Sequence, residues 1–303
     1  MSYEDTKMEV LWKGDILFGC LYLCATPIGN LEDITLRCLR TLEKVDLIAA
    51  EDTRRTIKLL NHYEISKSMI SYHEHNKRTR GGEILKLLKE GKDIALVTDA
   101  GMPCISDPGE ELVKLCVEED IEVISIPGVS ASLAALSISG LSTRYFSFEG
   151  FLPVKGRKRR ERLNSLKDES RTIIIYESPY RILSTLKDLH EVLGDRNISV
   201  SRELTKKYEE TIRGDIKSVI KEFSDRSIKG EFVLIIQGKT LRDLCSEEDF
   251  WEGLGVEDHI RYHMNKGLSK KQSISLVAKE RKTSKREVYK IGIGIEGIDR
   301  GPS

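Results

Sequence analysis

The sequence predicts an α/β protein with two sheet domains, the first mainly parallel and the second mixed, followed by a small basic helical extension. Short apolar runs alternate with helix-like segments between residues 18 and 138. After residue 143, several strand-like runs follow one another without intervening helices. Beyond about residue 246, the pattern becomes helical. Continuous apolar strands that alternate with helices are typical of a parallel sheet covered on both faces.

The first domain, residues 18–142, is expected to contain five strands that are each followed by a helix. We expect the strands at residues 21–25, 45–50, 69–72, 93–97 and 121–126. We expect the helices from residue 35 onward and at residues 53–62, 77–89, 110–116 and 130–139. Residues 1–17 precede this pattern as an N-terminal extension.

The second domain, residues 143–240, is expected to form a mixed or antiparallel sheet because several of its strands are consecutive. Its strands are expected at residues 145–151, 171–176, 197–202, 209–213 and 231–237, with one helix at residues 179–193. Residues 246–303 are expected to form a small helical domain with a tail. In that region Ser269 and Ser284 are suited to cap two short helices, and Ser284 with Glu287 has capping-box spacing.

The bulk composition restricts the class of protein. Lys plus Arg equals Asp plus Glu at 49 each, so a globally basic nucleic-acid-binding protein is excluded and any such surface must be local. The six cysteines contain no C-x-x-C pair, which favours buried free thiols in a reducing compartment. No apolar run approaches the roughly 20 residues needed to span a bilayer, and residues 1–15 lack the core of a signal peptide. We therefore expect a cytoplasmic protein without a membrane association.

Five loops directly follow predicted strands and concentrate small, polar and conformationally special residues. They are residues 26–30, 51–55, 98–109, 127–131 and 177–181. The third of these, the Asp99 loop (residues 98–109), holds two Asp, two Gly and two Pro. Taken alone, it also fits an ordinary strand-to-helix turn. Because the carboxyl ends of parallel strands meet at one sheet edge, five such loops together predict a ligand-binding cleft between two domains.

Several familiar kinds of site are disfavoured. Residues 26–30 contain one Gly and not G-x-G-x-x-G, and the chain has no G-x-x-x-x-G-K-[ST] loop for nucleotide phosphates. His73 and His75 lack a third ligand in sequence, so a solvated loop is expected. His259 and His263 are spaced i, i+4, but no nearby partner completes a site, and surface histidines are expected. We therefore expect no metal.

Charge clusters indicate a polyanionic partner. Residues 51–55 place two acids and two bases at a helix start, where they either cap the helix or turn carboxylates to the cleft and arginines to an anionic substrate. Residues 155–162 carry six bases against one acid, and residues 266–290 are also basic. Two basic tracts in a neutral chain favour binding of phosphates, although charged runs are often only solvated faces.

An ordered series of motifs resembles one known family. The motifs are CATPIGNLEDIT (24–35), AEDTR (50–54), SYHEHN (71–76), TDAGMPCISDPG (98–109), FEGFLP (148–153), YESP (176–179) and RELTKK (202–207). Together they resemble the bacterial small-subunit ribosomal RNA cytidine 2′-O-methyltransferases of the tetrapyrrole methylase superfamily, over about residues 20–238. The chain departs from the family pattern at Arg55 and Tyr180, where histidines are expected, and in the loop positions Met102, Cys104 and Val129.

The resemblance implies a two-domain tetrapyrrole-methylase-like fold that binds S-adenosylmethionine in the interdomain cleft, as a homodimer. The implied cofactor-binding residues are Thr26, Pro27, Asp99, Ala100, Gly101, Cys104, Ile105, Ser130, Ala131, Tyr176 and Glu231. The implied substrate is a cytidine ribose of 16S rRNA in the 30S ribosomal subunit. The basic residues that would then bind RNA are Arg54, Arg55, Lys155, Arg157, Lys158, Arg159, Arg160, Lys270, Lys271, Lys285 and Arg286.

The implied reaction is an in-line displacement at a sulfonium methyl group, which requires no metal. Aligning the reacting atoms can lower such a barrier by about 7–11 kcal/mol at best. A ribose hydroxyl is a poor nucleophile and benefits from a proton acceptor, for which Glu51, Asp52 and Glu177 are the candidates. Two alternatives remain: a tetrapyrrole C-methyltransferase or diphthine-type methylase of the same fold, and a non-catalytic ribosome-assembly factor.

Overall fold

The computed structural model describes residues 18–224, 226–239 and 254–295. The chain divides into two compact units, Met1–Gly238 and Lys239–Ser303. The predicted N-terminal extension and the helical onset expected at 246–253 lie outside the described residues. Among the residues that are described, no helix is long and apolar enough to cross a membrane.

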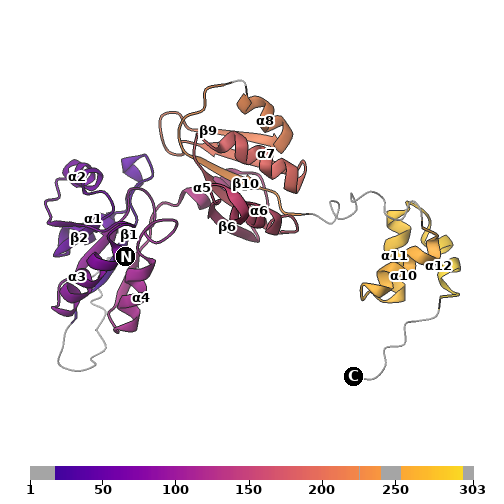
Figure 1. The fold of residues 1–303 in the computed structure, drawn as a ribbon, viewed down its shortest axis with the longest axis horizontal. Helices are drawn as coiled ribbons and strands as arrows, with labels where there is room; N and C mark the ends of the chain where they lie inside the picture. Colours follow the sequence, from indigo (N-terminus) through magenta and orange to yellow (C-terminus); the bar gives the residue numbers. More distant parts are fainter. Residues whose placement is uncertain (1–17, 225, 240–253, 296–303) are drawn as a thin grey trace, which may run out of the picture. The chain divides into compact units, whose positions relative to one another are not determined.

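The first sheet is parallel throughout, as predicted. Figure 1 labels its strands β1 and β2 together with the helices α1 to α4 of this domain. Its strands are β1 (Leu21–Cys24), β2 (Leu47–Ala50), β3 (Met69–Ser71), β4 (Ile94–Val97) and β5 (Val123–Ile126), in the spatial order β3-β2-β4-β1-β5. The helices are α1 (Leu36–Lys44), α2 (Thr53–His62), α3 (Lys77–Lys89) and α4 (Glu110–Glu118), with a 3-10 turn, η1, at Leu31–Asp33.

Both faces of the first sheet are covered, which explains its continuous apolar strands. Helices α1 and α2 pack Leu42 and Leu60 on one face, and α3 and α4 pack Leu88 and Leu112 on the other. All four residues of β4 are buried. Helices α1 and α2 begin at side-chain caps: Thr35 Oγ1 accepts the backbone N–H of Cys38, and Asp52 accepts that of Arg54.

The second sheet is mixed, also as predicted. Its strands are β6 (Phe146–Phe151), β7 (Thr172–Glu177), β8 (Asn197–Arg202), β9 (Glu210–Asp215) and β10 (Phe232–Ile236), in the order β6-β7-β10-β8-β9. Only β6 and β7 run parallel among these pairs. One face is covered by α6 (Gly156–Ser165), α7 (Ile182–Leu193) and α8 (Ile216–Ser224). Helices α6 and α8 were not expected from the sequence. In the basic α6, Leu163 is the one apolar residue, which is too few to show an apolar stripe.

Helix α5 (Ala131–Ile138) joins the two halves of the first unit. It follows β5 of the first sheet, but its buried residues Ala135 and Leu136 pack against Ile174 of β7 and Ile235 of β10. The start of α5 is therefore held between the two sheets, close to the carboxyl edge of the first one.

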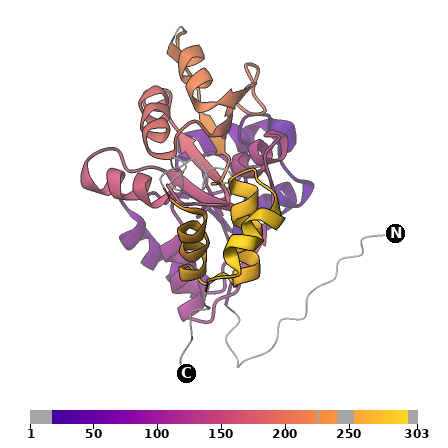
Figure 2. The same cartoon turned by 90° about the vertical axis from the view of Figure 1, so that its right-hand side faces the viewer.

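The second unit contains three described helices, α10 (Val256–Asn265), α11 (Lys270–Glu280) and α12 (Lys285–Gly292), which are the yellow helices of Figure 2. The two helices expected there are α11 and α12, and α10, which carries His259 and His263, precedes them. Both predicted caps are present. Ser269 forms a full capping box with Gln272, whereas Ser284 caps Glu287 N and the Glu287 carboxylate accepts from Thr283 Oγ1 instead.

Candidate functional site

A cavity of about 320 Å³ lies at the carboxyl edge of the first sheet. Its walls come from residues 26–29 after β1, from α2, from residues 98–100 after β4, and from Lys206 and Glu231, which lie next to strands of the second sheet. This volume lies within the usual range of small-molecule sites. Among the predicted cofactor residues, Thr26, Pro27, Asp99, Ala100 and Glu231 line the cavity.

Two strand-end loops are hydrogen-bonded to each other beneath this cavity. Thr26 N donates to Gly101 O and Gly101 N donates to Thr26 O, both at 2.9 Å. Thr26 Oγ1 also donates to Thr98 O at 3.0 Å. Gly101 has a φ of +82° and Gly109 a φ of +144°, and a Cβ on Gly109 would lie 2.4 Å from Cys104 Sγ. The Asp99 loop therefore requires glycine at residue 109 and favours it at residue 101, and its bonds to Thr26 fix its shape before any ligand arrives.

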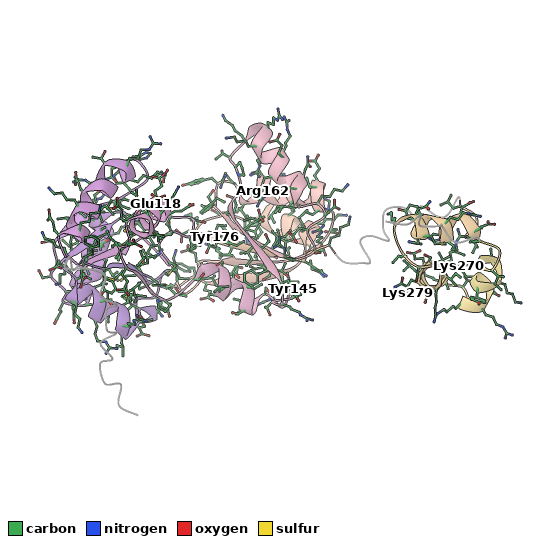
Figure 3. The ribbon with its side chains drawn as sticks, turned by 90° about the horizontal axis from the view of Figure 1, so that it is seen from below. Glu118, Tyr145, Arg162, Tyr176, Lys270 and Lys279 are labelled. Atoms are coloured by element: carbon green, nitrogen blue, oxygen red, sulfur yellow. The ribbon has the colours of Figure 1, made fainter. Side chains whose placement is uncertain are left out.

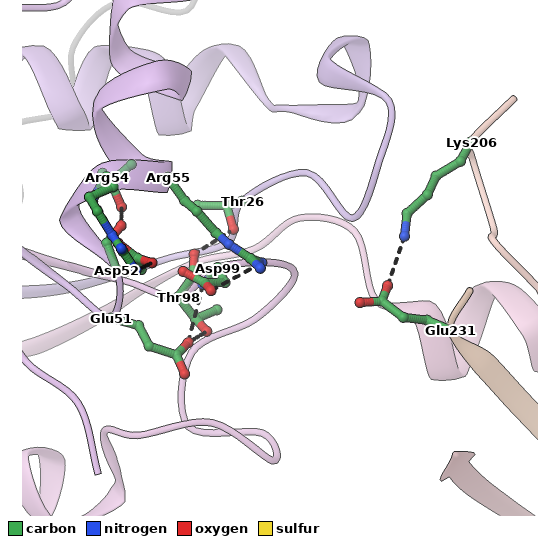
Figure 4. A network of polar contacts seen from close by, with 10 residues as sticks. Thr26, Glu51, Asp52, Arg54, Arg55, Thr98, Asp99, Lys206 and Glu231 are labelled. Atoms are coloured by element: carbon green, nitrogen blue, oxygen red, sulfur yellow. Dashed lines mark hydrogen bonds and ion pairs between the residues drawn. The ribbon is translucent and has the colours of Figure 1, made fainter. Parts of the chain in front are cut away.

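Asp99 presents a carboxylate with one satisfied oxygen and one unsatisfied oxygen. Its Oδ2 pairs with Arg55 Nη1 at 3.2 Å (Figure 4). Its Oδ1 is buried and has no hydrogen-bond partner in the described part of the chain. Burial and, after it, the neighbouring Glu51 carboxylate raise the pKa of Asp99. An unpaired buried acceptor on a cavity wall is suited to a ligand's hydrogen-bond donor.

The two predicted acids after β2 have different surroundings (Figure 4). Glu51 Oε2 accepts Thr98 Oγ1 at 2.6 Å and Asp99 N at 3.3 Å, so its carboxylate adjoins two residues of the cavity wall. Asp52 caps α2 by accepting Arg54 N and pairs with the Arg54 side chain at 2.8 Å. That contact is the main reason why the pKa of Asp52 is lowered to about 2. The cap reading applies to Asp52. Glu51 contacts two wall residues without lining the cavity itself, so its cleft-facing role remains a prediction.

The side chain of Glu177 lies elsewhere than the sequence predicts. Its side chain is fully buried, pairs with Arg181 at 2.8 Å and accepts Thr185 Oγ1 at 2.7 Å. The expectation of a free carboxylate at the cleft mouth is therefore wrong. The neighbouring Tyr176, labelled in Figure 3, accepts Ser132 N through its hydroxyl at 3.1 Å and so ties β7 to the start of α5.

The remaining predicted cofactor residues lie outside the cavity walls. Ser130 is the N-cap residue of α5, directly before Ala131. Cys104 is half-buried at a φ of +71°, and burial raises the pKa of its thiol to about 11. Ile105 beside it is 49% exposed. Ser130, Ala131, Gly101, Cys104 and Ile105 therefore remain predictions as ligand contacts.

The structure adds Lys206 to the site. Lys206 Nζ bridges Glu203 at 3.0 Å and Glu231 at 2.8 Å on the second-sheet side of the cavity. Nearby, Asn30 N donates to Thr205 Oγ1 at 3.0 Å and connects the first loop to the same segment. The motif RELTKK contained this signal, since Lys206 lies within it. Asp107 lies in the Asp99 loop and is half-buried.

The protonation of Asp107 predicts a pH-dependent stability. Burial, then the Glu51 and Asp99 carboxylates, raise the pKa of Asp107 to about 7. Because its folded pKa lies above the unfolded value of about 3.9, the folded chain favours protonated Asp107. This contribution to the free energy of unfolding is fully present below the unfolded value and is lost as the pH rises through about 7. We expect Asp107→Asn to be more stable than wild type by on the order of 2 kcal/mol near pH 8 and equally stable near pH 4. Urea unfolding across this range checks it, and a difference independent of pH would contradict it.

The predicted RNA-binding residues divide into exposed and structural groups. Lys155, Arg157, Lys158 and Arg160 are exposed on and beside α6. Arg159 is 8% exposed and binds Asp188 and Thr185, so its expected RNA contact is wrong. In α11, Lys270 donates to Ile295 O at 2.6 Å, and Figure 3 labels it with Lys279 of the same helix. Lys271, Lys285 and Arg286 are exposed.

Comparison with known proteins supplies the family. The model of the tetrapyrrole (corrin/porphyrin) methylases matches residues 20–220. The chain is 49% identical over 273 residues to the ribosomal RNA small subunit methyltransferase I of Halalkalibacterium halodurans, covering 90% of this chain and 94% of that protein. It is 50% identical over 281 residues to the protein of the same name from Synechocystis sp., covering 92% and 99%.

A solved structure agrees with the fold. Uroporphyrin-III C-methyltransferase from Thermus thermophilus, complexed with S-adenyl homocysteine, matches at a TM-score of 0.53 and 17% identity, over 72% of this chain and 97% of that chain. This likeness concerns the fold alone. The family model and the sequence relatives show that the chain belongs to the tetrapyrrole (corrin/porphyrin) methylase family, with ribosomal RNA small subunit methyltransferases I as its relatives.

Proposed function

We propose that this methyltransferase transfers a methyl group from S-adenosylmethionine to the 2′-hydroxyl of a cytidine in 16S rRNA of the small ribosomal subunit. The carrying observation is the cavity at the carboxyl edge of the first sheet, where Asp99 Oδ1 lacks a partner among the described residues. Relatives at about half identity named for the small-subunit ribosomal RNA support this substrate class.

The cofactor would occupy the cavity between the two sheet halves. The residues that line it offer what such a molecule needs: apolar surface from Pro27, Ile28 and Ala100 for a nucleoside, and carboxylates from Asp99 and Glu231 for hydroxyl or ammonium donors. S-Adenosylmethionine supplies the electrophilic methyl group when bound. Because the Asp99 loop already has a fixed shape, its backbone and the Asp99 carboxylate would not need to change conformation when the cofactor binds.

Among the candidate acids, Glu51 is the proton acceptor that we propose. Its carboxylate adjoins Thr98 and Asp99 of the cavity wall, whereas Asp52 caps α2 and Glu177 is buried against Arg181. The ribose oxygen forms a bond to the methyl carbon as the carbon–sulfur bond breaks and the hydroxyl proton passes to the carboxylate. S-Adenosylhomocysteine leaves as a neutral thioether.

The proposal is tested with reconstituted 30S subunits that lack the modification. Wild-type protein and labelled S-adenosylmethionine should place one ribose methyl on a cytidine, located by nuclease digestion and mass spectrometry. Glu51→Gln should lower the rate of transfer by about 100-fold or more while leaving cofactor affinity nearly unchanged. Calorimetry that finds no S-adenosylmethionine binding to the wild type would favour a non-catalytic assembly factor. A methylated product other than rRNA would reject the substrate.

The exposed bases of α6 should contribute to RNA affinity through phosphate contacts. A variant with Lys155, Arg157, Lys158 and Arg160 changed to Gln should bind more weakly. Its plot of log affinity against log salt should be flatter by up to about 3 units, at about 0.7 per contact with single-stranded RNA. Filter binding to a 16S rRNA fragment at several salt concentrations measures this slope.

A matched control removes the same kind of charge elsewhere in the second sheet half. Lys187, Lys217 and Lys221 are exposed on α7 and α8, and their change to Gln should leave the slope nearly unaltered. Equal slopes for the α6 variant and the wild type would remove α6 from the RNA interface.

We infer a homodimer as the working assembly. Exposed apolar side chains on α5 and around β6, including Leu133 at 53%, Tyr145 at 63% and Phe146 at 41%, provide surface that a second copy would bury. Sedimentation equilibrium gives the mass directly, and a monomer at micromolar concentration would reject this assembly.

A further inference from the structure

The helical unit contains a buried polar cluster that the proposed reaction does not use. His259 and His263 of α10 are 0% and 7% exposed, which corrects the expectation of surface histidines. Glu280, at the end of α11, turns its carboxylate to both rings. Its Oε2 lies 2.8 Å from His259 Nε2 and 2.9 Å from His263 Nε2, and the two Nε2 atoms are 3.2 Å apart.

Three electron-pair donors therefore converge on one point from two helices. The i, i+4 spacing places both imidazoles on one face of α10, and α11 supplies the carboxylate. A tetrahedral ion with bonds of about 2.0–2.1 Å separates its ligand atoms by about 3.3 Å. The observed separations need to widen only by a few tenths of an ångström to accept such an ion.

Hydrogen bonds alone explain this arrangement less well. Two ring N–H groups that donate to the same oxygen would lie side by side at the 3.2 Å separation of the nitrogens. Their like dipoles would oppose each other. A cation at the centre would replace the protons on the two Nε2 atoms and bind the lone pairs of His259 Nε2, His263 Nε2 and Glu280 Oε2.

One neighbour has to adjust. Arg281 Nε donates to His259 Nδ1 at 3.1 Å, which places the His259 proton on Nε2 in the metal-free chain. Binding through Nε2 would move that proton to Nδ1, so the Arg281 contact to this atom would be released. The Arg281 Nη2 atom also donates to Leu254 O at 2.5 Å, and that bond can remain.

The size of the unit gives such an ion a structural purpose. Its buried apolar core consists of Ile260, Ile274, Val277, Ala278, Val288 and Ile295. The unit spans Lys239–Ser303, a size at which a single core contributes little stability and disulfides or metals commonly assist. An ion held between α10 and α11 would fasten these helices together.

We propose that His259, His263 and Glu280 form a binding site for a divalent transition-metal ion of the zinc class, with a structural role in the helical unit. Two imidazoles and one carboxylate are ligands that suit this class. A solvent molecule would complete the tetrahedron, and the proposal is independent of the methyl-transfer function.

Cobalt(II) and zinc(II) are the probes for the full-length protein. After treatment with chelator, wild type should bind one Co²⁺ per chain, with the intense visible absorption of a tetrahedral site, and Zn²⁺ should displace it. Glu280→Gln keeps the side-chain shape and should weaken Zn²⁺ binding by about 100-fold or more in competition with a chromophoric chelator. His263→Gln should do the same.

The control variant His75→Gln changes an exposed histidine in the first unit and should leave affinity and stoichiometry unchanged. Circular dichroism of each apo variant shows whether the helices still form, so that loss of the site is separated from loss of the fold. Absence of a tetrahedral Co²⁺ spectrum in folded wild type would overturn the proposal. Zn²⁺ binding of equal strength in wild type and folded Glu280→Gln would overturn it as well.

Discussion

Replacing Asp99 by Asn is expected to weaken S-adenosylmethionine binding by about 10- to 100-fold. The unpaired Oδ1 of Asp99 lies buried on the cavity wall, and a hydrogen bond from a ligand to a charged acceptor contributes about 1.5–3 kcal/mol. Asn has the same shape but no charge, and it leaves Arg55 without its 3.2 Å partner. Calorimetric titration of the cofactor into both proteins measures the effect.

The surroundings of Asp99 make the variant informative. Burial and the Glu51 carboxylate already raise the pKa of Asp99, so removing its charge relieves repulsion and should not unfold the loop. Glu119→Gln, which breaks an exposed pair with Lys89 on another face, is the control and should bind the cofactor normally. Unchanged affinity in Asp99→Asn would mean that the cofactor does not engage this oxygen.

Local sequence patterns predicted most of the fold because its elements obey simple periodicities. The strand β4 is a continuous apolar run that is buried on both faces, and α2 begins at an Asp cap and ends at the predicted residue. Helix α6 was missed because its sequence, GRKRRERLNS, is dominated by charge. It becomes helical through tertiary contacts, in which Leu163 packs on the second sheet and Arg159 binds Asp188.

Less of the candidate site than of the fold was predicted. The position of a loop after a strand indicates at which edge of the sheet the loop lies, but not whether its side chains face the cavity or the protein interior. Glu51 and Glu177 both follow a strand directly. Glu51 adjoins the cavity wall, whereas Glu177 turns into the protein and meets Arg181. The His259 cluster depends on Glu280, which lies on another helix and has no fixed spacing in sequence from the histidines.

These outcomes share a physical reason. Burial of a charged side chain requires a partner, and the partner is supplied by a different element of the fold. Arg159 was expected to contact phosphates with its neighbours on α6. Its side chain instead pairs with Asp188 of α7 and is not part of the exposed basic surface of α6. The exposed bases of α6 are therefore a smaller set than the basic tract suggested, and the proposed RNA surface is correspondingly specific.

Removing the Glu177 carboxylate should give the largest loss of stability among the candidate acids. Glu177 is fully buried, and Glu177→Ala would remove the carboxylate that pairs with Arg181 and accepts Thr185 Oγ1, leaving Arg181 only its bond to Leu152 O. Breaking a buried ion pair from one side costs about 3–5 kcal/mol. We expect urea unfolding to show a loss of about 3 kcal/mol for Glu177→Ala, and a smaller one for Glu177→Gln, which keeps an oxygen for Thr185.

Activity separates this structural role from a catalytic one. If Glu177 accepted the ribose proton, Glu177→Gln would lower the rate of methyl transfer by about 10²- to 10⁴-fold at any level of folding. Because its carboxylate is enclosed by Arg181, Thr185 and Ser178 N, we expect transfer per folded molecule to stay within a few-fold of wild type. A large loss of methyl-transfer rate in a fully folded Glu177→Gln protein would identify Glu177 as the proton acceptor and contradict that role for Glu51.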